Sequence, residues 1–310
     1  MTPGRMVAIA VAAVLAAQSS GVKAASPEPT PARRNGLERY HYSITARVRP
    51  LVMFWITRRD VGDAVVSRSV TPGEARYSLL IGSDPDRAPL HINRWGYIEE
   101  DIRGVDARLV GLMTESDEES IQQAEANVRK GPGGGRAFKA IETTFDGQQA
   151  RSHLTSFAAP EDYTFRQLST VLGLAARRQS GDGTTRAVRL PPGARPGFLA
   201  ALADAMHEPS LNRIVYAYYG RLYELRRMRM QSVTNLLIDQ KTYGPAVTAD
   251  FVIVSLHDGE RTRFSMTYGR LGQFAEVPLK AVYQPRWWMQ IELTIDDTGD
   301  GPAVTAGVTR

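Results

Sequence analysis

Alternation of apolar and polar residues with a period of two, interrupted by short turn sequences, is the feature that most constrains the fold of this chain. In the last third, three pairs of such segments follow one another: 213–218 and 221–230, 248–257 and 260–268, and 275–283 and 286–295. The connections are Tyr219-Gly220, Asp258-Gly259 and Gln284-Pro285, and two-residue connections of this kind join antiparallel strands. For the first segment, a helix over 211–219 is the alternative. Successive hairpins predict an antiparallel meander, which can curl into a half-barrel or a closed barrel.

The first half of the chain contains further strand signals. Tyr40, Tyr42 and Ile44 begin an alternating run that is typical of a half-buried strand. Segments 63–70 and 76–81 flank Thr71-Pro72-Gly73-Glu74, and segments 138–145 and 149–157 flank Asp146-Gly147. Each of these two pairs predicts a hairpin, and one more strand is expected over 109–113.

Helices are expected between these strands. Ser116 and Glu119 form a capping box that begins the first one. Apolar residues recur at helical spacing over 165–178 and again over 196–206. The sequence therefore predicts a β-rich α+β fold, in which antiparallel β-meander or half-barrel sheets carry a few packed helices.

The N-terminus has the three-part layout of a secretory signal peptide. Arg5 supplies the positive charge, residues 6–17 are an apolar run too short to span a bilayer, and Val22-Lys23-Ala24 offers a cleavage site with small residues. An uncleaved N-terminal anchor is the alternative. We expect a periplasmic or secreted protein that has no transmembrane span after signal cleavage.

These signals divide the chain into consecutive parts. They are a signal peptide over 1–24, a proline-rich tether over 25–37, a β-rich region with one helix over 38–158, a helical segment over 159–210, an antiparallel meander over 211–297 and a disordered tail over 298–310. The sequence leaves open whether the two β-rich regions form one sheet or two domains.

Composition excludes several classes of protein. With 43% hydrophobic and 23% charged residues among 310, the chain has the composition of a folded protein. It contains no cysteine, which rules out a disulfide, a cysteine nucleophile, a zinc ribbon and an iron–sulfur cluster. The net charge of +5 comes mainly from scattered arginines, so we expect no nucleic-acid partner. In the densest run, Arg226, Arg227 and Arg229 alternate with two methionines, which predicts that the arginines form the solvated face of a strand.

The chain lacks the common catalytic motifs. None of its five histidines lies three or four residues from another, and there is no H-E-x-x-H, G-x-S-x-G or G-x-G-x-x-G sequence. The acidic run that begins at Asp296 resembles the start of a calcium loop, but Gly307 occupies the position that requires a bidentate glutamate. We therefore expect no catalytic residue, no metal site and no cofactor.

One segment, 81–101, combines charged and aromatic side chains, and we interpret it as a loop region. Loops with such side chains are where ligand contacts concentrate, so the candidate ligand-binding residues are Asp84, Asp86, Arg94, Trp95 and Tyr97, together with Trp288. The alternative interpretation is structural: Ser83 or Asp84 caps a turn, Arg87 and Arg94 pair with Asp86 and Glu99, and Trp95 covers the edge of a sheet.

Side-chain direction in the meander also follows from the alternation. In the final strand, Trp287 should lie on the buried face and Trp288 on the solvated face. Next to Asp258-Gly259, we expect Phe264, Met266 and Tyr268 to point to the core, and Arg261, Arg263 and Ser265 to point outward.

The strings Leu80-Ile-Gly-Ser-Asp-Pro-Asp-Arg-Ala-Pro89, Ile92-Asn-Arg-Trp-Gly-Tyr-Ile98, Ser116-Asp-Glu-Glu-Ser120 and Tyr283-Gln-Pro-Arg-Trp-Trp288 carry a resemblance. They are similar to sequences in a group of exported proteins of Gram-negative bacteria that has no assigned activity. The resemblance implies a β-rich envelope protein and implies no catalytic residues.

Two classes of function remain. The sequence favours a non-enzymatic envelope protein that binds an apolar or amphipathic ligand, or an envelope partner, on a curved β-sheet. The alternative is an envelope hydrolase that uses carboxylates and a histidine around residues 84–101, and it requires Asp84, Asp86, His91 and Glu99 to converge in one pocket.

Export predicts a specific mature N-terminus. Because Val22-Lys23-Ala24 is the cleavage signal, the protein purified from its native host should begin close to residue 25. Mass spectrometry of the N-terminal peptide measures this directly, and an intact Met1 on a cytosolic protein contradicts it.

Overall fold

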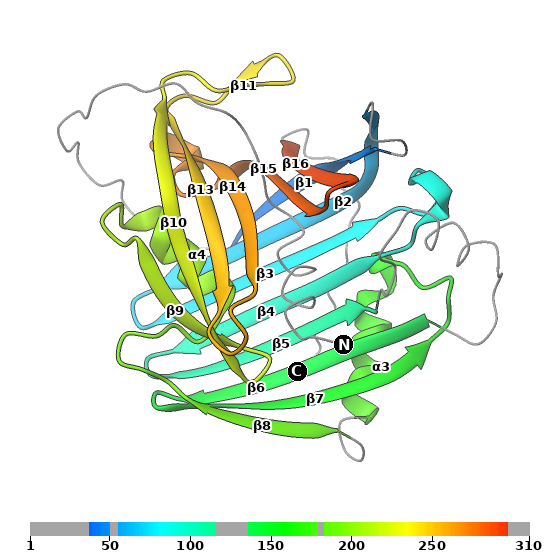
Figure 1. Ribbon diagram of the computed structural model, residues 1–310, viewed down its shortest axis with the longest axis vertical. Coiled ribbons are helices and arrows are strands. Elements are labelled where there is room, and N and C mark those ends of the chain that lie inside the picture. Colours follow the sequence, from blue (N-terminus) through cyan, green and yellow to red (C-terminus); the bar gives the residue numbers. More distant parts are fainter. Residues whose placement is uncertain (1–36, 50–54, 116–135, 179–182, 297–310) are drawn as a thin grey trace.

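The computed structural model describes residues 37–49, 55–115, 136–178 and 183–296 (Figure 1). Its strands are β1 (Glu38–Val48), β2 (Ile56–Thr71), β3 (Glu74–Ser83), β4 (Trp95–Arg103), β5 (Asp106–Thr114), β6 (Arg136–Asp146), β7 (Gln149–Ala159), β8 (Thr184–Arg189), β9 (Arg213–Tyr218), β10 (Arg221–Val233), β11 (Leu237–Ile238), β12 (Lys241–Thr242), β13 (Ala246–Ser255), β14 (Arg261–Gly269), β15 (Pro278–Arg286) and β16 (Met289–Asp296). Its helices are α3 (Leu168–Arg178) and α4 (Phe198–His207), with the short 3-10 helices η1 (Pro89–His91), η2 (Phe165–Gln167) and η3 (Gly272–Phe274).

Fourteen of these strands form one sheet, in the order β8-β7-β6-β5-β4-β3-β2-β1-β16-β15-β14-β13-β10-β9. Neighbouring strands are antiparallel throughout, and the pairing of β1 with β16 joins the two ends of the described chain. The sheet curls until it is nearly closed and barrel-like, with β8 and β9 as its edges (Figure 1). The expected β-rich α+β fold is confirmed, and the two β-rich regions share one sheet.

The sheet has two differently covered faces. Strands β1 to β8 form a broad curved layer, and β10, β13 and β14 cross in front of it (Figure 1). The main apolar core lies between these layers and includes α4. On the opposite face, α3 and η2 cover β4 to β7, where Val171 and Phe165 pack with Trp95, Phe138 and Phe157.

Most of the expected turns are confirmed, but the connection expected at Asp258-Gly259 spans 256–260, because β13 ends at Ser255 and β14 begins at Arg261. Pro72 and Gly73 connect β2 to β3, and a hairpin turn at Gly147 connects β6 to β7. Tyr219 and Gly220 connect β9 to β10 with φ of 56° and 66°, which is the conformation of a type I′ hairpin turn. The alternative of a helix over 211–219 is therefore wrong. The two expected helices over 165–178 and 196–206 correspond to η2 with α3 and to α4.

The last hairpin turns at a different place from the one expected. Gln284 and Pro285 lie within β15, and the turn consists of Trp287 and Trp288. Proline is tolerated there because the pairing of β15 with β16 shifts between Tyr283 and Arg286, and an irregular register does not require a ladder donor at residue 285.

This turn reverses the expected burial of the tryptophans. Trp287 is 60% exposed and Trp288 is 7% exposed, so the expectation that Trp287 is the buried one is wrong. Strand alternation does not apply because both residues lie in the turn. The carbonyl of Trp288 accepts a hydrogen bond from the backbone amide of Arg49 at 2.7 Å, which ties the turn to the end of β1.

The arginine run on β10 also departs from the expected alternation. Arg227 is buried, whereas Met228 and Met230 are exposed. The pairing of β10 with β13 shifts between Arg227 and Arg229, and such a bulge changes which side chains face inward. The expectation that the arginines share a solvated face is wrong for Arg227.

Side-chain directions in β14 are confirmed with one exception. Phe264, Met266 and Tyr268 are buried, and Arg261 and Arg263 are both exposed. Ser265 was expected outward and is buried. It is a small residue in an interior strand, between Asp250 of β13 and Val282 of β15, so larger neighbours shield it.

Some expectations lie outside the described residues. They concern the signal peptide, the tether as far as residue 36, the helix that begins at Ser116 and the tail over 298–310. Among the described residues, no helix has the length and apolar character needed to cross a bilayer.

The adjacent tryptophans of the β15–β16 turn provide a test of this packing. Trp288→Ala removes a buried ring and should lower the free energy of unfolding by about 3–5 kcal/mol. Trp287→Ala removes an exposed ring and should change it by less than about 0.5 kcal/mol. Urea unfolding of both variants measures the difference, and equal losses would contradict the packing of this turn.

Candidate functional site

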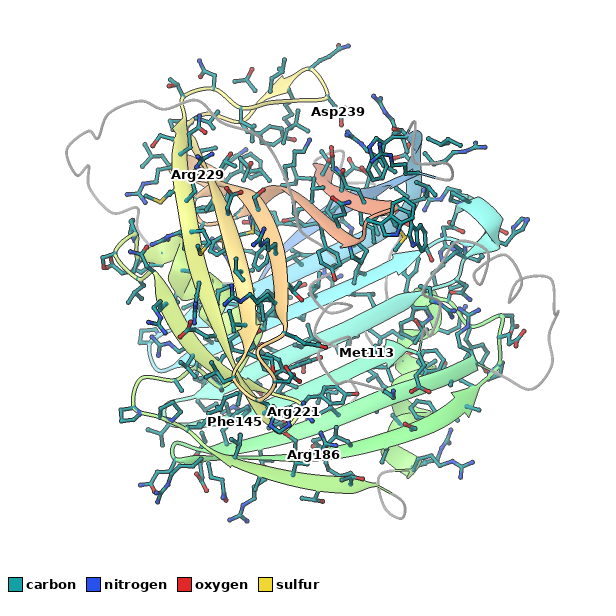
Figure 2. The ribbon with its side chains drawn as sticks, in the orientation of Figure 1. Met113, Phe145, Arg186, Arg221, Arg229 and Asp239 are labelled. Carbon is teal, nitrogen blue, oxygen red and sulfur yellow. The ribbon has the colours of Figure 1, made fainter. Side chains whose placement is uncertain are left out.

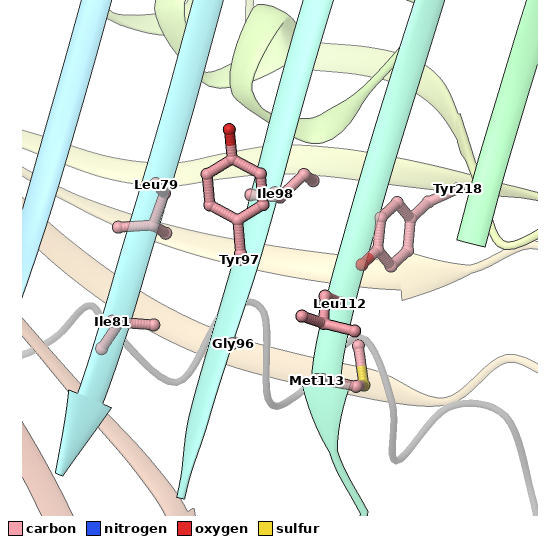
Figure 3. A pocket seen from close by; sticks show the side chains of 8 residues that line it. All are labelled: Leu79, Ile81, Gly96, Tyr97, Ile98, Leu112, Met113 and Tyr218. Carbon is pink, nitrogen blue, oxygen red and sulfur yellow. The ribbon is translucent and has the colours of Figure 1, made fainter. Parts of the chain in front are cut away.

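A pocket lies between the curved layer and β9 (Figure 3). Strands β3, β4 and β5 supply most of its lining, and β9 supplies one tyrosine; the lining residues are Leu79, Ile81, Gly96, Tyr97, Ile98, Leu112, Met113 and Tyr218. The cavity volume is about 10 Å³, which is room for about one water-sized group. The side chains of Leu79, Ile81, Ile98 and Met113 are apolar, so the pocket suits one small apolar group.

Glycine makes room for the tyrosine of this pocket. A Cβ atom at Gly111 would lie 2.6 Å from Cγ2 of Ile141 and 3.4 Å from the hydroxyl oxygen of Tyr218. The first distance is too short for any side chain without movement of Ile141. Gly111 therefore allows Tyr218 to approach the surface of β5 closely.

Tyr218 belongs to a cluster of buried tyrosines on the β9–β10 hairpin, which we call the tyrosine cluster: Tyr216, Tyr218, Tyr219 and Tyr223. Tyr216 and Tyr223 are directly opposite each other in the β9–β10 pair and their rings stack at 5.7 Å. The rings of Tyr218 and Tyr219 are 5.5 Å apart. All four hydroxyl groups are buried and have no hydrogen-bond partner among the described residues.

Such hydroxyl groups are energetically costly. A buried polar group without a partner typically costs about 1–3 kcal/mol, and most native structures have few of them. Burial raises the pKa of Tyr216 and of Tyr218 well above the usual value of 10, and nearby tyrosines and Glu100 raise it further. The hydroxyls therefore stay protonated and remain available as donors.

Glu100 is a buried acidic residue whose charge acts on Tyr216 and Tyr218 of this cluster. It lies on β4 and is almost completely buried, and its carboxylate accepts hydrogen bonds from the amides of Leu199 at 2.8 Å and Ala200 at 2.9 Å. These amides belong to the first turn of α4, so the carboxylate caps the helix and interacts with the positive end of its dipole. Gly197 makes this approach possible, because a Cβ atom there would lie 2.3 Å from the carboxylate.

Burial sets the acidity of Glu100. It raises the pKa of Glu100 to about 7, although the hydrogen bonds from Leu199, Ala200 and Phe198 favour the charged form. Glu100 is therefore a carboxyl group that titrates near neutral pH in the core.

Five of the residues selected from the sequence lie along the adjoining ends of β3 and β4, and only Trp288 lies elsewhere. Asp84 and Asp86 are in the turn that follows β3. Asp84 is buried and accepts hydrogen bonds from Arg87 and Arg166, both at 2.9 Å, and from the amide of Asp86 at 3.1 Å. Burial raises the pKa of Asp84, but the bonds from Arg166, Asp86 and Arg87 outweigh it and hold the pKa below its usual range. This carboxylate organises the turn.

Trp95 and Tyr97 lie on β4, which corrects the interpretation of 81–101 as a loop throughout. The Trp95 ring packs edge to face on Phe138 with ring centres 5.1 Å apart, and its indole nitrogen donates to the carbonyl of Tyr163 at 3.2 Å. Its position in an interior strand differs from the expected sheet edge. Tyr97 lines the pocket, and its hydroxyl donates to Glu99 at 2.5 Å.

The other two candidate residues, Arg94 and Trp288, form hydrogen bonds through their backbone atoms. Arg94 precedes β4, where its amide donates to the hydroxyl of Ser83 at 2.8 Å. Trp288 lies in the β15–β16 turn, and β1, β2 and β3 separate β16 from β4 in the sheet. The structure thus brings Asp84, Asp86, Arg94, Trp95 and Tyr97 to the adjoining ends of β3 and β4 and leaves Trp288 apart.

The carboxylates proposed for a hydrolase have different partners. Asp84 pairs with arginines, while Glu99 contacts Arg76 at 2.9 Å and the Tyr97 hydroxyl. His91 contacts the carbonyl of Pro85 through Nδ1 at 2.9 Å. In the part of the chain that the structure describes, no group of three or more His, Asp or Glu side chains could hold a metal ion.

Sequence reasoning missed the tyrosine cluster and Glu100. Four tyrosines fall within residues 216–223, and this density is a visible signal, although alternation alone explains it as strand. Glu100 gave no signal, because its partners in α4 are about a hundred residues away along the chain.

The comparisons with known proteins leave the site without a counterpart. No protein-family model matches the chain, and neither curated proteins nor solved structures give a match.

The raised pKa of Glu100 predicts a pH-dependent stability. Between pH 4.5, its usual pKa, and about 7, the folded protein keeps this proton and the unfolded chain has lost it. Raising the pH through this window should therefore lower the free energy of unfolding, by an amount on the order of a few kcal/mol. Glu100→Gln cannot ionise and should lack this component.

Denaturant unfolding of both proteins below and above this window isolates the effect, because all other carboxylates are common to the two. A difference between them that stays constant with pH would contradict the assignment.

Proposed function

We propose that the protein is an exported, non-enzymatic binding protein of the cell envelope, located in the periplasm or secreted. Its ligand is an apolar or amphipathic small molecule, which binds between the curved layer of the sheet and the β9–β10 hairpin. The support is one observation: the unpartnered hydroxyl of Tyr218 borders a small apolar pocket.

The side chains that line the pocket favour a ligand with an apolar part and an oxygen atom that accepts a hydrogen bond. Leu79, Ile81, Ile98 and Met113 offer apolar contact, which favours a short hydrocarbon part. Tyr218 brings a hydroxyl donor to the same pocket. A ligand oxygen that accepts this hydrogen bond would remove the cost of a buried donor, which makes such a contact worth more than one that merely replaces water.

The partners of the acidic residues weigh against the hydrolase alternative. General acid–base chemistry needs a group within hydrogen-bond reach of a substrate. Asp84 is held by two arginines and Glu99 by an arginine and a tyrosine. These carboxylates satisfy structural contacts, so binding without catalysis is the function that the geometry supports best.

Tyr218→Phe tests the proposal through two opposite effects. Without ligand, the variant loses an unpartnered buried hydroxyl, so its free energy of unfolding should stay equal or rise by up to about 1 kcal/mol. Its affinity for n-alkanoates of increasing length should fall about fivefold, because one hydrogen bond is lost. Calorimetric titration measures the affinity and thermal unfolding measures the stability.

Tyr42→Phe is the matched control. The Tyr42 hydroxyl donates to the carbonyl of Pro278 at 2.7 Å, so this change should lower stability by about 1 kcal/mol and leave alkanoate affinity unchanged. Absence of alkanoate binding by the wild-type protein, or equal affinity in Tyr218→Phe, would overturn the proposal.

A further inference from the structure

Exposed aromatic and aliphatic side chains gather at one end of the sheet, which we call the tryptophan end: Trp55, Ile56 and Trp287. They are 37%, 44% and 60% exposed. Among the described residues, Trp55 and Trp287 are the only aromatic side chains with large exposure. A cluster of large apolar side chains in solvent is unusual in a soluble fold and marks an interaction surface.

The sheet register brings these residues together. Val48 at the end of β1 pairs with Ile56 of β2 on one side and with Met289 of β16 on the other. Trp55 directly precedes Ile56, and Trp287 lies two residues before Met289. Trp55 and Ile56 therefore lie on one side of the end of β1 and Trp287 on the other, although Trp287 is more than 230 residues from them in sequence.

Arg49 links the two exposed tryptophans. Its guanidinium carbon lies 5.7 Å from the centre of the Trp55 ring, within the range of a cation–π contact. Its backbone amide donates to the carbonyl of Trp288, next to Trp287. Arg49 thus adds a positive charge beside Trp55 and ties the end of β1 to the turn that carries Trp287.

Further positive charge lies beside it on β2. Arg58 and Arg59 are exposed, and they form no ion pair among the described residues. Arg47 is the next arginine on β1 and contacts Glu292 at 3.4 Å. The acidic residue nearest along β2 is Asp60, so Arg49, Arg58 and Arg59 leave this surface with an excess of positive charge.

We propose that the tryptophan end docks on the surface of an anionic phospholipid bilayer. Tryptophan rings favour the interfacial zone of a bilayer, where the ring is partly buried and its N–H meets polar headgroups. Arginines beside them attract anionic headgroups. This combination fits a lipid surface better than a second copy of the chain, because facing arginines of two copies would repel.

Vesicle sedimentation tests the proposal with the whole mature protein. The wild-type protein should bind vesicles of phosphatidylcholine and phosphatidylglycerol, and should bind vesicles of phosphatidylcholine alone more weakly. Salt should weaken the first interaction because it screens exposed charges. Replacing Arg58 and Arg59 by glutamine should reduce binding to the anionic vesicles by about fivefold for each arginine.

Trp287→Ala should reduce binding to both kinds of vesicle by about tenfold, since it removes an exposed ring that would enter the interface. Val105→Ala changes an apolar residue at the β4–β5 turn that is more exposed than Trp287, 75% against 60%, and should bind as the wild type does. Thermal unfolding checks that every variant is folded.

Two results overturn the proposal. One is that the wild-type protein fails to bind anionic vesicles. The other is that Trp287→Ala binds them as tightly as Val105→Ala does. A dimer in analytical ultracentrifugation that Trp287→Ala abolishes, without vesicle binding by the wild type, would assign the surface to a second copy. Neither result bears on the interior pocket, which Tyr218→Phe tests separately.

Discussion

Helix α4 is held between the two layers of the sheet by a buried charge at each end, and the arrangement of the core depends on it. Glu100 from β4 accepts hydrogen bonds from the first amides of α4. Arg227 from β10 donates to the carbonyls of Ala205 at 2.5 Å and Leu211 at 3.1 Å, and also to that of Pro209. A negative charge at the amino end and a positive charge at the carboxyl end both complement the helix dipole. Since β4 and β10 belong to different layers, the helix fixes the distance between them.

The position of the pocket follows from the way Glu100 and Arg227 hold the two ends of α4. With α4 filling part of the space between the layers, the hairpin β9–β10 lies against β3 to β5, and Tyr218 reaches the surface of β5 at Gly111. The buried polar groups at the ends of α4 therefore have hydrogen-bond partners, whereas the hydroxyl groups of the tyrosine cluster have none among the described residues. This lack of partners distinguishes the tyrosine cluster from an ordinary packed core.

The sequence predicted the parts of this fold that depend on local chemistry. Turn residues such as Tyr219-Gly220 and Pro72-Gly73 require particular backbone angles, and helical spacing is visible within ten residues, so hairpins and helices were predictable. The pairing of β1 with β16 was not, because nothing local specifies a partner some 250 residues away. The bulge that buries Arg227 and the turn at Trp287 and Trp288 were missed for a related reason: both break the alternation on which the prediction rested. The sequence does not distinguish Glu100 from the neighbouring acidic residues, because its partners in α4 become apparent only in the folded structure.

The two proposals meet in the geometry of the strand ends. Ile56 begins β2, Ser83 ends β3 and Trp95 begins β4, and the register pairs Gly62 with Ser83 and Gly82 with Trp95. These termini therefore lie toward the same end of the sheet, and the pocket residues Ile81 and Gly96 are each within two residues of one of them. A protein that rests on a bilayer through Trp55 and Trp287 would turn this end of the sheet, and with it the nearer side of the pocket, toward the lipid. Ile81 pairs with Ala64, eight residues along β2 from Ile56, so an amphipathic molecule that left the bilayer would travel on the order of 26 Å along β2 to reach the apolar side chains and the hydroxyl of Tyr218.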